Sequence, residues 1–357
     1  MSELVLVRPR CNDKCRTMRL QEVLEYALRG RDYRLVERLE DFKGLQNQRI
    51  IFAVSQGISG INLEYFRFLK VLRLNHQMLK GAVGGIIVDG ESELYTKSIA
   101  RDFVFTANQC GCTFPGRPLV EGTGSLQNFN IQAMNLETDN MGAYLKASRE
   151  LVDTVAGFSQ KPKKRPKILM LHASNFRTSN TVNFWQMTKE NLKGCEIKEI
   201  SLRNGSIQDC AGCPYKMCMH FSRRSNCYYG GVIVEQVYPA VQNCDALVLL
   251  CPNYNDAVSA NLSAFINRLT ALFRKNRFSE KNLFAVIISG YSGGDLVAEQ
   301  LISGLNMNKS FILPSQFAFL ETANDPESIL EVENIQEKAR EFAKHIMNTL
   351  KAVPDEP

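Results

Sequence analysis

Hydrophobic residues in the second half of the chain form short unbroken runs that alternate with segments of helical spacing. Such runs predict strands buried on both faces of a parallel sheet. The predicted strands are "KILMLH" (167–172), "EIKEISL" (196–202), "DALVLLCP" (245–252), "NLFAVIISG" (282–290) and "QFAFLE" (316–321). The predicted helices are 181–192, 259–273, 295–306 and 326–351. This alternation predicts a doubly wound, five-stranded parallel α/β sheet covered by helices on both faces.

The first half repeats the pattern with less clarity. Its predicted strands are 3–9, 49–57, 82–90 and 117–122, and its predicted helices are 17–29, 61–74, 93–108 and 129–156. "RIIFAVSQG" aligns with "DALVLLCPN", and "GGIIVDG" aligns with "FAVIISG". We therefore expect two tandem flavodoxin-like copies, the first of them degenerate. Domain one lacks most of a counterpart to 203–231.

The stretch "FSQKPKKRPK" (158–167) is polar and carries two prolines, which is typical of a linker. The expected division is a degenerate domain at 1–157, a linker at 158–166 and a second domain at 167–357. The 357 residues fit two domains of ordinary size.

Composition narrows the class of protein. The chain is 45% hydrophobic and 22% charged, with a formal charge of +6, which is globular and only mildly basic. No nucleic-acid partner is expected. No apolar run approaches the roughly 18 residues of a membrane span, and the N-terminus has no secretory pattern. We expect a soluble, cytoplasmic protein without membrane contact, whose eleven cysteines are thiols or ligands rather than disulfides.

The stretch "LMLHASNFRTSNT" (169–181) joins the first strand of domain two to its helix. In parallel α/β sheets this loop is where phosphate groups bind, because the helix N-terminus offers unpaired N–H groups. Its hydroxyl and amide side chains are Ser174, Asn175, Thr178, Ser179, Asn180 and Thr181, and Arg177 adds a forked cationic donor. The nucleotide patterns G-x-x-x-x-G-K-[ST] and G-x-G-x-x-G are absent. A monophosphate cradle is the favoured reading, and a simple helix cap is the alternative.

Three loops together resemble one family. "HASNFRTSNT" (172–181) resembles the G-S-x-R-x-x-S-N-T loop of NAD(P)H-dependent FMN reductases, with His172 in place of glycine. "CPNYNDAVSANLSAFINR" (251–268) resembles the family's second flavin loop, with Ser263 and Asn267 replacing the usual lysine and aspartate. "ISGYSGG" (288–294) resembles its third loop. The resemblance covers about residues 167–325.

The resemblance implies a flavin site. The residues implied for the FMN phosphate are Ser174, Arg177, Ser179, Asn180 and Thr181. The residues implied for the isoalloxazine ring are Pro252, Asn253, Tyr254 and Asn255, with close backbone approach at Gly290 and Gly293. No catalytic acid or base is expected, because the flavin carries the chemistry.

The segment "DCAGCPYKMCMHFSRRSNC" places four cysteines together: Cys210, Cys213, Cys218 and Cys227. Related iron–sulfur flavoproteins use C-x2-C-x2-C and a fourth cysteine, whereas the spacing here is C-x2-C-x4-C-x8-C. Three readings stay open: free thiols near the flavin, an iron–sulfur cluster, or zinc. His220 is a substitute ligand in the metal readings.

Domain one lacks the hydroxyl cradle, since "RPRCNDKCRTMRL" carries basic residues and one hydroxyl, at Thr17. We expect it to hold no FMN in this mode and to take the place of a partner subunit, so that the protein is an internal pseudo-dimer or a homodimer.

The predicted function is an FMN-dependent NAD(P)H oxidoreductase, with NAD(P)H as co-substrate and an unidentified small-molecule or protein electron acceptor. The alternatives are an iron–sulfur electron-transfer flavoprotein without its own nicotinamide site, and a non-enzymatic binding protein with a relict site.

Overall fold

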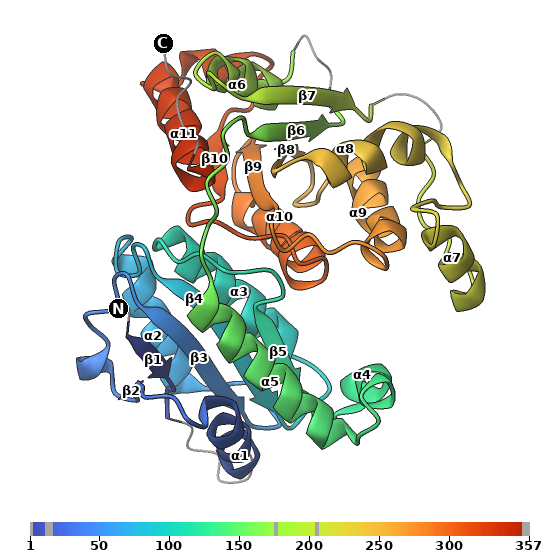
Figure 1. Cartoon of the computed structure of the whole chain (residues 1–357). Helices are drawn as coiled ribbons and strands as arrows, with labels where there is room; N and C mark the ends of the chain where they lie inside the picture. The colour runs from blue at the N-terminus through green and yellow to red at the C-terminus, as the bar shows by residue number, and fades with distance from the viewer. Residues whose placement is uncertain (1–2, 11–16, 175–177, 204–206, 352–357) are drawn as a thin grey trace. The chain divides into compact units, whose positions relative to one another are not determined.

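The computed structural model describes residues 3–10, 17–174, 178–203 and 207–351. The chain divides into two compact units, Met1–Phe158 (unit 1) and Ser159–Pro357 (unit 2). Each unit is built on one five-stranded parallel sheet (Figure 1). No helix among the described residues is both long and apolar enough to cross a membrane.

Unit 1 has the strand order β2-β1-β3-β4-β5. Its strands are β1 (Leu4–Val7), β2 (Arg34–Val36), β3 (Arg49–Gln56), β4 (Val83–Gly90) and β5 (Leu119–Gly122). Its helices are α1 (Thr17–Leu28), α2 (Leu63–Leu74), α3 (Thr96–Gln109), α4 (Asn130–Asn135) and α5 (Asn140–Gly157). Helices α1, α4 and α5 share one apolar core with the sheet. The predicted helix 129–156 is thus two helices, and the three-residue strand β2 was not predicted.

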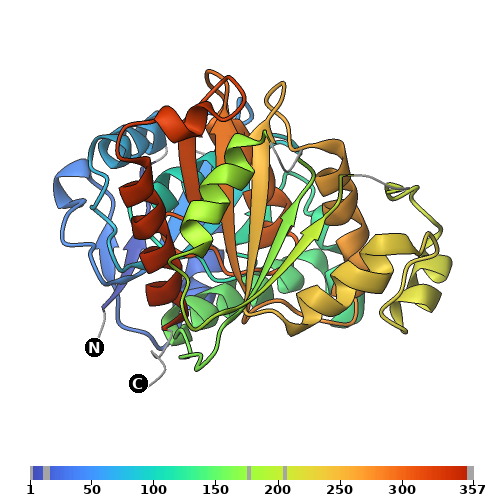
Figure 2. The same cartoon turned by 90° about the horizontal axis from the view of Figure 1, so that it is seen from above.

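Unit 2 has the strand order β10-β9-β8-β6-β7. Its strands are β6 (Lys167–His172), β7 (Glu196–Ser201), β8 (Ala246–Asn253), β9 (Asn282–Ser289) and β10 (Ala318–Thr322). Its helices are α6 (Asn180–Lys189), α7 (Tyr215–Ser222), α8 (Tyr238–Asn243), α9 (Ala260–Phe273), α10 (Gly294–Leu301) and α11 (Ile335–Leu350). Helices α6 and α11 lie on one face of this sheet, as Figure 2 shows, and share a core with β6, β8 and β9.

The two sheets have the same topology, because β1 to β5 occupy the positions of β6 to β10. Even the isolated parallel bridges correspond: Val83 pairs with Thr113 at the start of β4, and Asn282 pairs with Ile312 at the start of β9. The predicted tandem of flavodoxin-like domains is therefore confirmed.

The units differ between their second and third strands. Unit 2 inserts α7, a π-helical turn (Ile233–Val237) and α8 there, whereas unit 1 has a single 3-10 turn at Leu39–Asp41. The sequence predicted that domain one lacks most of a counterpart to 203–231, and the structure shows this as the missing α7 region. Two predicted helices of unit 2 are also shorter than expected: α10 continues as a π-helical turn (Ile302–Met307), and α11 follows a separate 3-10 turn, η5 (Ser328–Glu331).

Candidate functional site

Three loops of unit 2 leave the carboxyl ends of adjacent strands. They follow β6, β8 and β9, which lie side by side in the sheet. The chain changes direction between β6 and β8, because β7 lies on one side of β6 and β8 on the other. In sheets of this kind the crevice beyond the strand ends at such a switch point is where ligands bind.

The loop after β6 carries hydroxyl groups that make few bonds to the protein. Ser174 is buried, and its Oγ has no hydrogen-bond partner among the described residues. Ser179 is the N-cap residue of α6, yet its side chain makes no capping bond, and its Oγ lies 2.9 Å from the Oγ1 of Thr181. The alternative of a simple helix cap at Ser179 is thus not what the structure shows. Asn175 and Arg177 lie outside the described residues.

Asn180 is used by the protein itself. Its Nδ2 donates to the carbonyl oxygens of Ala323 (3.0 Å) and Asp325 (2.9 Å), and its Oδ1 accepts from the N–H of Ile329 (3.3 Å). The start of α6 is therefore tied to the segment that follows β10. This side chain positions the loop, and what it leaves for a ligand is its backbone N–H.

Asn253, at the end of β8, joins the second and third loops. Its Nδ2 donates to the carbonyl oxygen of Ser292 (2.8 Å), the Oγ of Ser289 (3.2 Å) and the Oδ1 of Asp256 (3.2 Å). Its Oδ1 is buried and has no partner within the described chain. A buried amide oxygen without a donor is costly, so a ligand donor placed there would be favoured.

Contacts with neighbouring loops explain why positions 290 and 293 are glycine. Gly293 has φ +83°, and a side chain there would collide with the Oδ1 of Asp256. A Cβ on Gly290 would lie 2.6 Å from the Oδ1 of Asn324. The resemblance implied close approach of a ring at both glycines, and these contacts between loops are a further reason for glycine that does not depend on a ring.

Two tyrosines stand out on the second and third loops. Tyr254 is 63% exposed and Tyr291 is 82% exposed, although aromatic side chains are usually covered. The hydroxyl of Tyr291 accepts from the Nδ2 of Asn324 at 3.3 Å, so its ring is anchored at the tip. Pro252 is half-buried and Asn255, with φ 53°, is exposed beside Tyr254.

Sequence reasoning missed Tyr291 and Ser259. Ser259 is the N-cap residue of α9, makes no capping bond and has a buried Oγ without a partner among the described residues. Both lie inside the quoted motifs, in "ISGYSGG" and "VSANL", so the available signal was their position beside the named residues.

His172 ends β6 and is buried. Burial lowers the pKa of its imidazole, and the backbone at Ser174 and the charge of Glu199 oppose that change. A neutral histidine packed at a strand end positions the loop that follows it.

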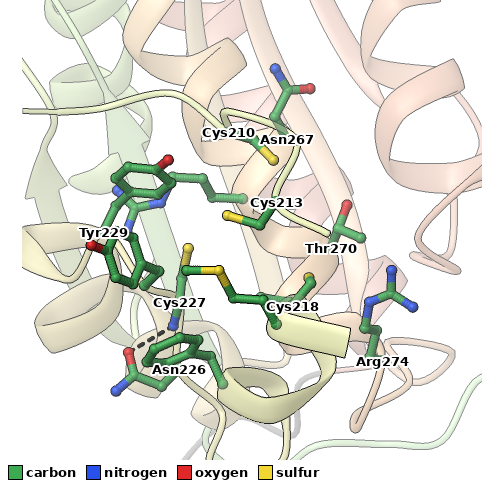
Figure 3. Close-up of a pocket in the computed structure, with 15 residues that line it drawn as sticks. Cys210, Cys213, Cys218, Asn226, Cys227, Tyr229, Asn267, Thr270 and Arg274 are labelled. Carbon is green, nitrogen blue, oxygen red and sulfur yellow. Dashed lines mark hydrogen bonds between the residues drawn. The ribbon is translucent and has the colours of Figure 1, made fainter. Parts of the chain in front are cut away.

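A second group of chemically active side chains lies away from the strand ends, between α7 and α9. All four cysteines of the cluster, Cys210, Cys213, Cys218 and Cys227, line one pocket of about 200 Å³ (Figure 3). We call it the thiol pocket. Aromatic walls come from Phe221, Tyr228 and Tyr229. Helix α9 contributes Asn267 and Arg268, and its C-cap residue Arg274 lines the pocket as well.

The thiol pocket does not have the geometry of a metal centre. Across the described residues, no group of three or more histidine, cysteine or acidic side chains is arranged to hold a metal ion. His220 is exposed, with its ring packed edge-on against Phe221 at 5.3 Å, and does not line the pocket.

The strand ends of unit 1 are filled differently. The Nε of Arg19, on α1, donates to the carboxylate of Asp89 at 2.7 Å, and Asp89 is fully buried at the end of β4. The same guanidinium donates to the carbonyl oxygens of Gly90, Gly122 and Thr123. A buried cation thus occupies the ends of β4 and β5 in unit 1, the counterparts of β9 and β10 in unit 2.

Topology and loops together define unit 2 as a flavodoxin-like α/β domain. The family model of NADPH-dependent FMN reductase matches residues 166–325, which confirms the resemblance inferred from the three loops. Unit 2 therefore carries a domain of the NADPH-dependent FMN reductase family over residues 166–325. A comparison with curated protein sequences gave no match.

Solved structures with similar folds share little sequence with this chain. NAD(P)H:quinone oxidoreductase from Methanothermobacter marburgensis is 14% identical, with a TM-score of 0.40, over 51% of this chain and 97% of its own. NADH:FMN oxidoreductase in its apo form is 15% identical, with a TM-score of 0.37, over 53% of this chain and 91% of its own. Rubredoxin oxygen:oxidoreductase from Desulfovibrio gigas is 15% identical, with a TM-score of 0.34, over 60% of this chain. The chain spans only 41% of the length of that last protein.

Proposed function

We propose that unit 2 binds FMN beyond the carboxyl ends of β6, β8 and β9 and that the protein oxidises NAD(P)H there. The observation that carries this proposal is the loop after β6. Its buried Ser174 hydroxyl has no partner among the described residues, and its Ser179 hydroxyl does not cap α6. Hydroxyls and helix N–H groups left in this state suit a phosphate monoester.

The phosphate would be held by the hydroxyls of Ser174, Ser179 and Thr181, by the backbone N–H groups at the start of α6, and by Arg177. The burial of Ser174 and Thr181 keeps water away from part of this cradle. Asn180 would act on the phosphate indirectly, because its side chain fixes the helix start through three hydrogen bonds.

The ring system would lie against the second and third loops. Pro252, Asn253, Tyr254 and Asn255 would border it, as the family resemblance implies. Gly290 and Gly293 keep the loop after β9 packed against Asn324 and Asp256, which shapes that border. The exposed rings of Tyr254 and Tyr291 offer faces on which a planar nicotinamide or acceptor can stack.

Bound FMN supplies a hydride acceptor, and the protein's part is binding, orientation and exclusion of water. No acid or base of the chain has to take part. The proposed acceptor is a small molecule or a protein that receives electrons at the same open face. A cytoplasmic location, and assembly as a homodimer or as an internal pair of the two units, are parts of the same proposal.

The test is the absorption spectrum of the purified protein. A yellow protein whose flavin band bleaches on adding NADPH or NADH supports the proposal. A colourless protein that takes up no added FMN contradicts it. The double variant Ser179→Ala with Arg177→Ala should keep its circular dichroism spectrum and lose FMN affinity, and unchanged flavin content in that variant would refute the cradle.

Unit 1 is proposed to bind no FMN. The guanidinium of Arg19 already fills its strand ends and pairs with Asp89, so a flavin would have to displace a buried ion pair. One flavin per chain is expected from the ratio of flavin to protein. A ratio near two would show that unit 1 carries a site as well.

The second candidate is an iron–sulfur electron-transfer flavoprotein. One observation favours it, namely that the four cysteines line a single pocket. Within the described residues, however, these cysteines are not arranged as ligands of a metal ion. The cysteines as they are arranged therefore do not fit an iron–sulfur cluster.

A further inference from the structure

The cysteines of the thiol pocket differ from the other cysteines that the structure describes. Burial raises the pKa of the thiols of Cys110, Cys112, Cys195, Cys244 and Cys251, to about 11 for Cys110 and about 12 for Cys244 and Cys251. Four of these five are buried, and Cys195 is half-buried with a raised pKa. The four pocket cysteines are exposed or half-buried, and none of the nine is in a disulfide. Thiol chemistry with dissolved reagents is therefore concentrated in the pocket.

Two of the pocket cysteines meet at one ring. Tyr229 lines the thiol pocket together with Cys213 and Cys227. Figure 3 shows the sulfur atoms of Cys213 and Cys227 turned toward the same space beside Tyr229. They come from loops on either side of α7, so this pairing would close a loop that contains α7 and Cys218, with Cys210 just outside it.

The segment is held against α9 by a buried cation. Arg268 is only 3% exposed, and its guanidinium donates to the carbonyl oxygens of Gln208 (3.2 Å) and Gly230 (2.6 Å). These carbonyls lie just before Cys210 and just after Cys227. Arg268 has no carboxylate partner in the described part of the chain, and its Nε is buried without a hydrogen bond there. Its charge is thus available to an anion that enters the pocket.

A second arginine lies at the rim. Arg274 lines the pocket and stacks on the ring of Tyr215 at 4.8 Å, and it too has no ion-pair partner among the described residues. Asp and Glu are missing from the side chains that line the described pocket. A space of about 200 Å³ with aromatic walls and two cations suits a small organic anion.

From this arrangement we infer that the thiol pocket is a dithiol redox site, separate from the flavin site, in which Cys213 and Cys227 exchange with a small disulfide that carries carboxylates. The thiolate of one cysteine attacks the disulfide R–S–S–R, forms a mixed disulfide and releases one thiol R–SH. The second cysteine then breaks the mixed disulfide, forms the Cys213–Cys227 bond and releases the second R–SH. Two protein thiols are oxidised and one small disulfide is reduced, so electrons and atoms balance.

The first experiment uses the full-length chain with Cys11→Ser and Cys15→Ser, which removes the two cysteines outside the described residues. The protein is incubated with oxidised glutathione, and free thiols are alkylated and mapped by peptide mass spectrometry. The expected product is a protein lighter by two hydrogen atoms that carries a Cys213–Cys227 cross-link. The number of pocket thiols that react rapidly with the alkylating reagent should fall from four to two. In Cys227→Ser the expected product is a mixed disulfide at Cys213. The control variant Cys244→Ser should behave like the parent.

The second experiment tests the charge of the pocket. Arg274→Ala is expected to slow oxidation by oxidised glutathione about fivefold, the effect of losing one partly screened charge contact of about 1 kcal/mol. Oxidation by neutral hydroxyethyl disulfide should stay unchanged. Arg277 lies in the segment after α9 and does not line the pocket, so Arg277→Ala removes the same charge and should leave both rates near those of the parent.

Three results would overturn the inference. They are a cross-link between any other pair of pocket cysteines, equal slowing of both disulfides by Arg274→Ala, and iron or zinc bound in stoichiometric amount to the anaerobically purified protein. The readouts are independent of flavin, so failure here leaves the proposed FMN site untouched, and a colourless protein would leave the dithiol site untouched.

Discussion

The Nε of Arg19 lies 2.7 Å from the carboxylate of Asp89, and together they fill the carboxyl end of the sheet in unit 1. Asp89 has no exposed surface and also accepts from the hydroxyl of Tyr144 at 3.2 Å. Its burial is tolerated only because the guanidinium and the phenol satisfy it. Unit 1 thereby keeps the topology of unit 2 with a buried ion pair at the ends of β4 and β5, the counterparts of β9 and β10.

Removing Arg19 should therefore destabilise unit 1 strongly. Arg19→Ala leaves a buried, unpaired carboxylate, for which the expected cost is about 3–5 kcal/mol in the free energy of unfolding. Urea unfolding followed by circular dichroism measures it. The matched control is Arg31→Ala, which breaks the exposed pair with Asp153 and should cost less than about 1 kcal/mol. Equal losses of unfolding free energy in Arg19→Ala and Arg31→Ala would show that the buried ion pair contributes no more to stability than the exposed one.

Ser174→Ala should weaken FMN binding without unfolding the protein. The hydroxyl makes no bond within the described residues, so the folded protein loses little when it is removed. A hydrogen bond to a charged group contributes about 1.5–3 kcal/mol, which corresponds to about 10- to 100-fold in the dissociation constant. Flavin fluorescence titration measures this constant. Ser201→Ala, at the end of β7, is the control and should bind FMN like the parent.

Gly293→Ala should disturb the flavin loops, and Gly294→Ala should not. Gly293 has φ +83°, and its added methyl would meet Asp256, whereas a Cβ on Gly294 lies at an ordinary 3.4 Å from the Oγ of Ser289. Strain of this kind costs about 1–3 kcal/mol. We expect a lower thermal midpoint and lower FMN content for Gly293→Ala alone. Identical behaviour of the two variants would contradict the packing argument.

Stability should fall as the pH drops below the ordinary histidine range. Burial lowers the pKa values of His345 and His172 in the folded state, so below about pH 6.5 the unfolded chain takes up protons that the folded chain does not. Each such proton reduces stability by at most about 1.4 kcal/mol per pH unit.

The imidazole of His345 packs on Phe284, and its Nε2 is buried without a hydrogen bond among the described residues. His345→Leu should therefore flatten the fall in stability between pH 7 and pH 5. The measurement is urea unfolding at several pH values, with exposed His76→Leu as the control. A slope that is unchanged in His345→Leu would exclude this histidine as a cause.

Local patterns predicted most of the elements and failed where the signal was short or interrupted. The runs at 245–252 and 282–290 became β8 and β9, because an unbroken apolar run is stable only in a doubly covered strand. Strand β2 has three residues, one of them the exposed Leu35, and so carries no period to detect. Helix α11 starts at Ile335 rather than near 326, because the 3-10 turn η5 precedes it.

The sequence by itself determined the tandem sheets, the polar loop after β6 and the family of unit 2, since these follow from patterns among residues that are close together in the sequence. Tertiary structure decided what the side chains do there. Asn180 is hydrogen-bonded to residues more than 140 positions away, and Arg268 binds the chain both before Cys210, at Gln208, and after Cys227, at Gly230. The partners of buried hydrogen-bonding groups and charges are the residues that tertiary packing places next to them. The local hydrophobic pattern of the sequence does not indicate which residues these are.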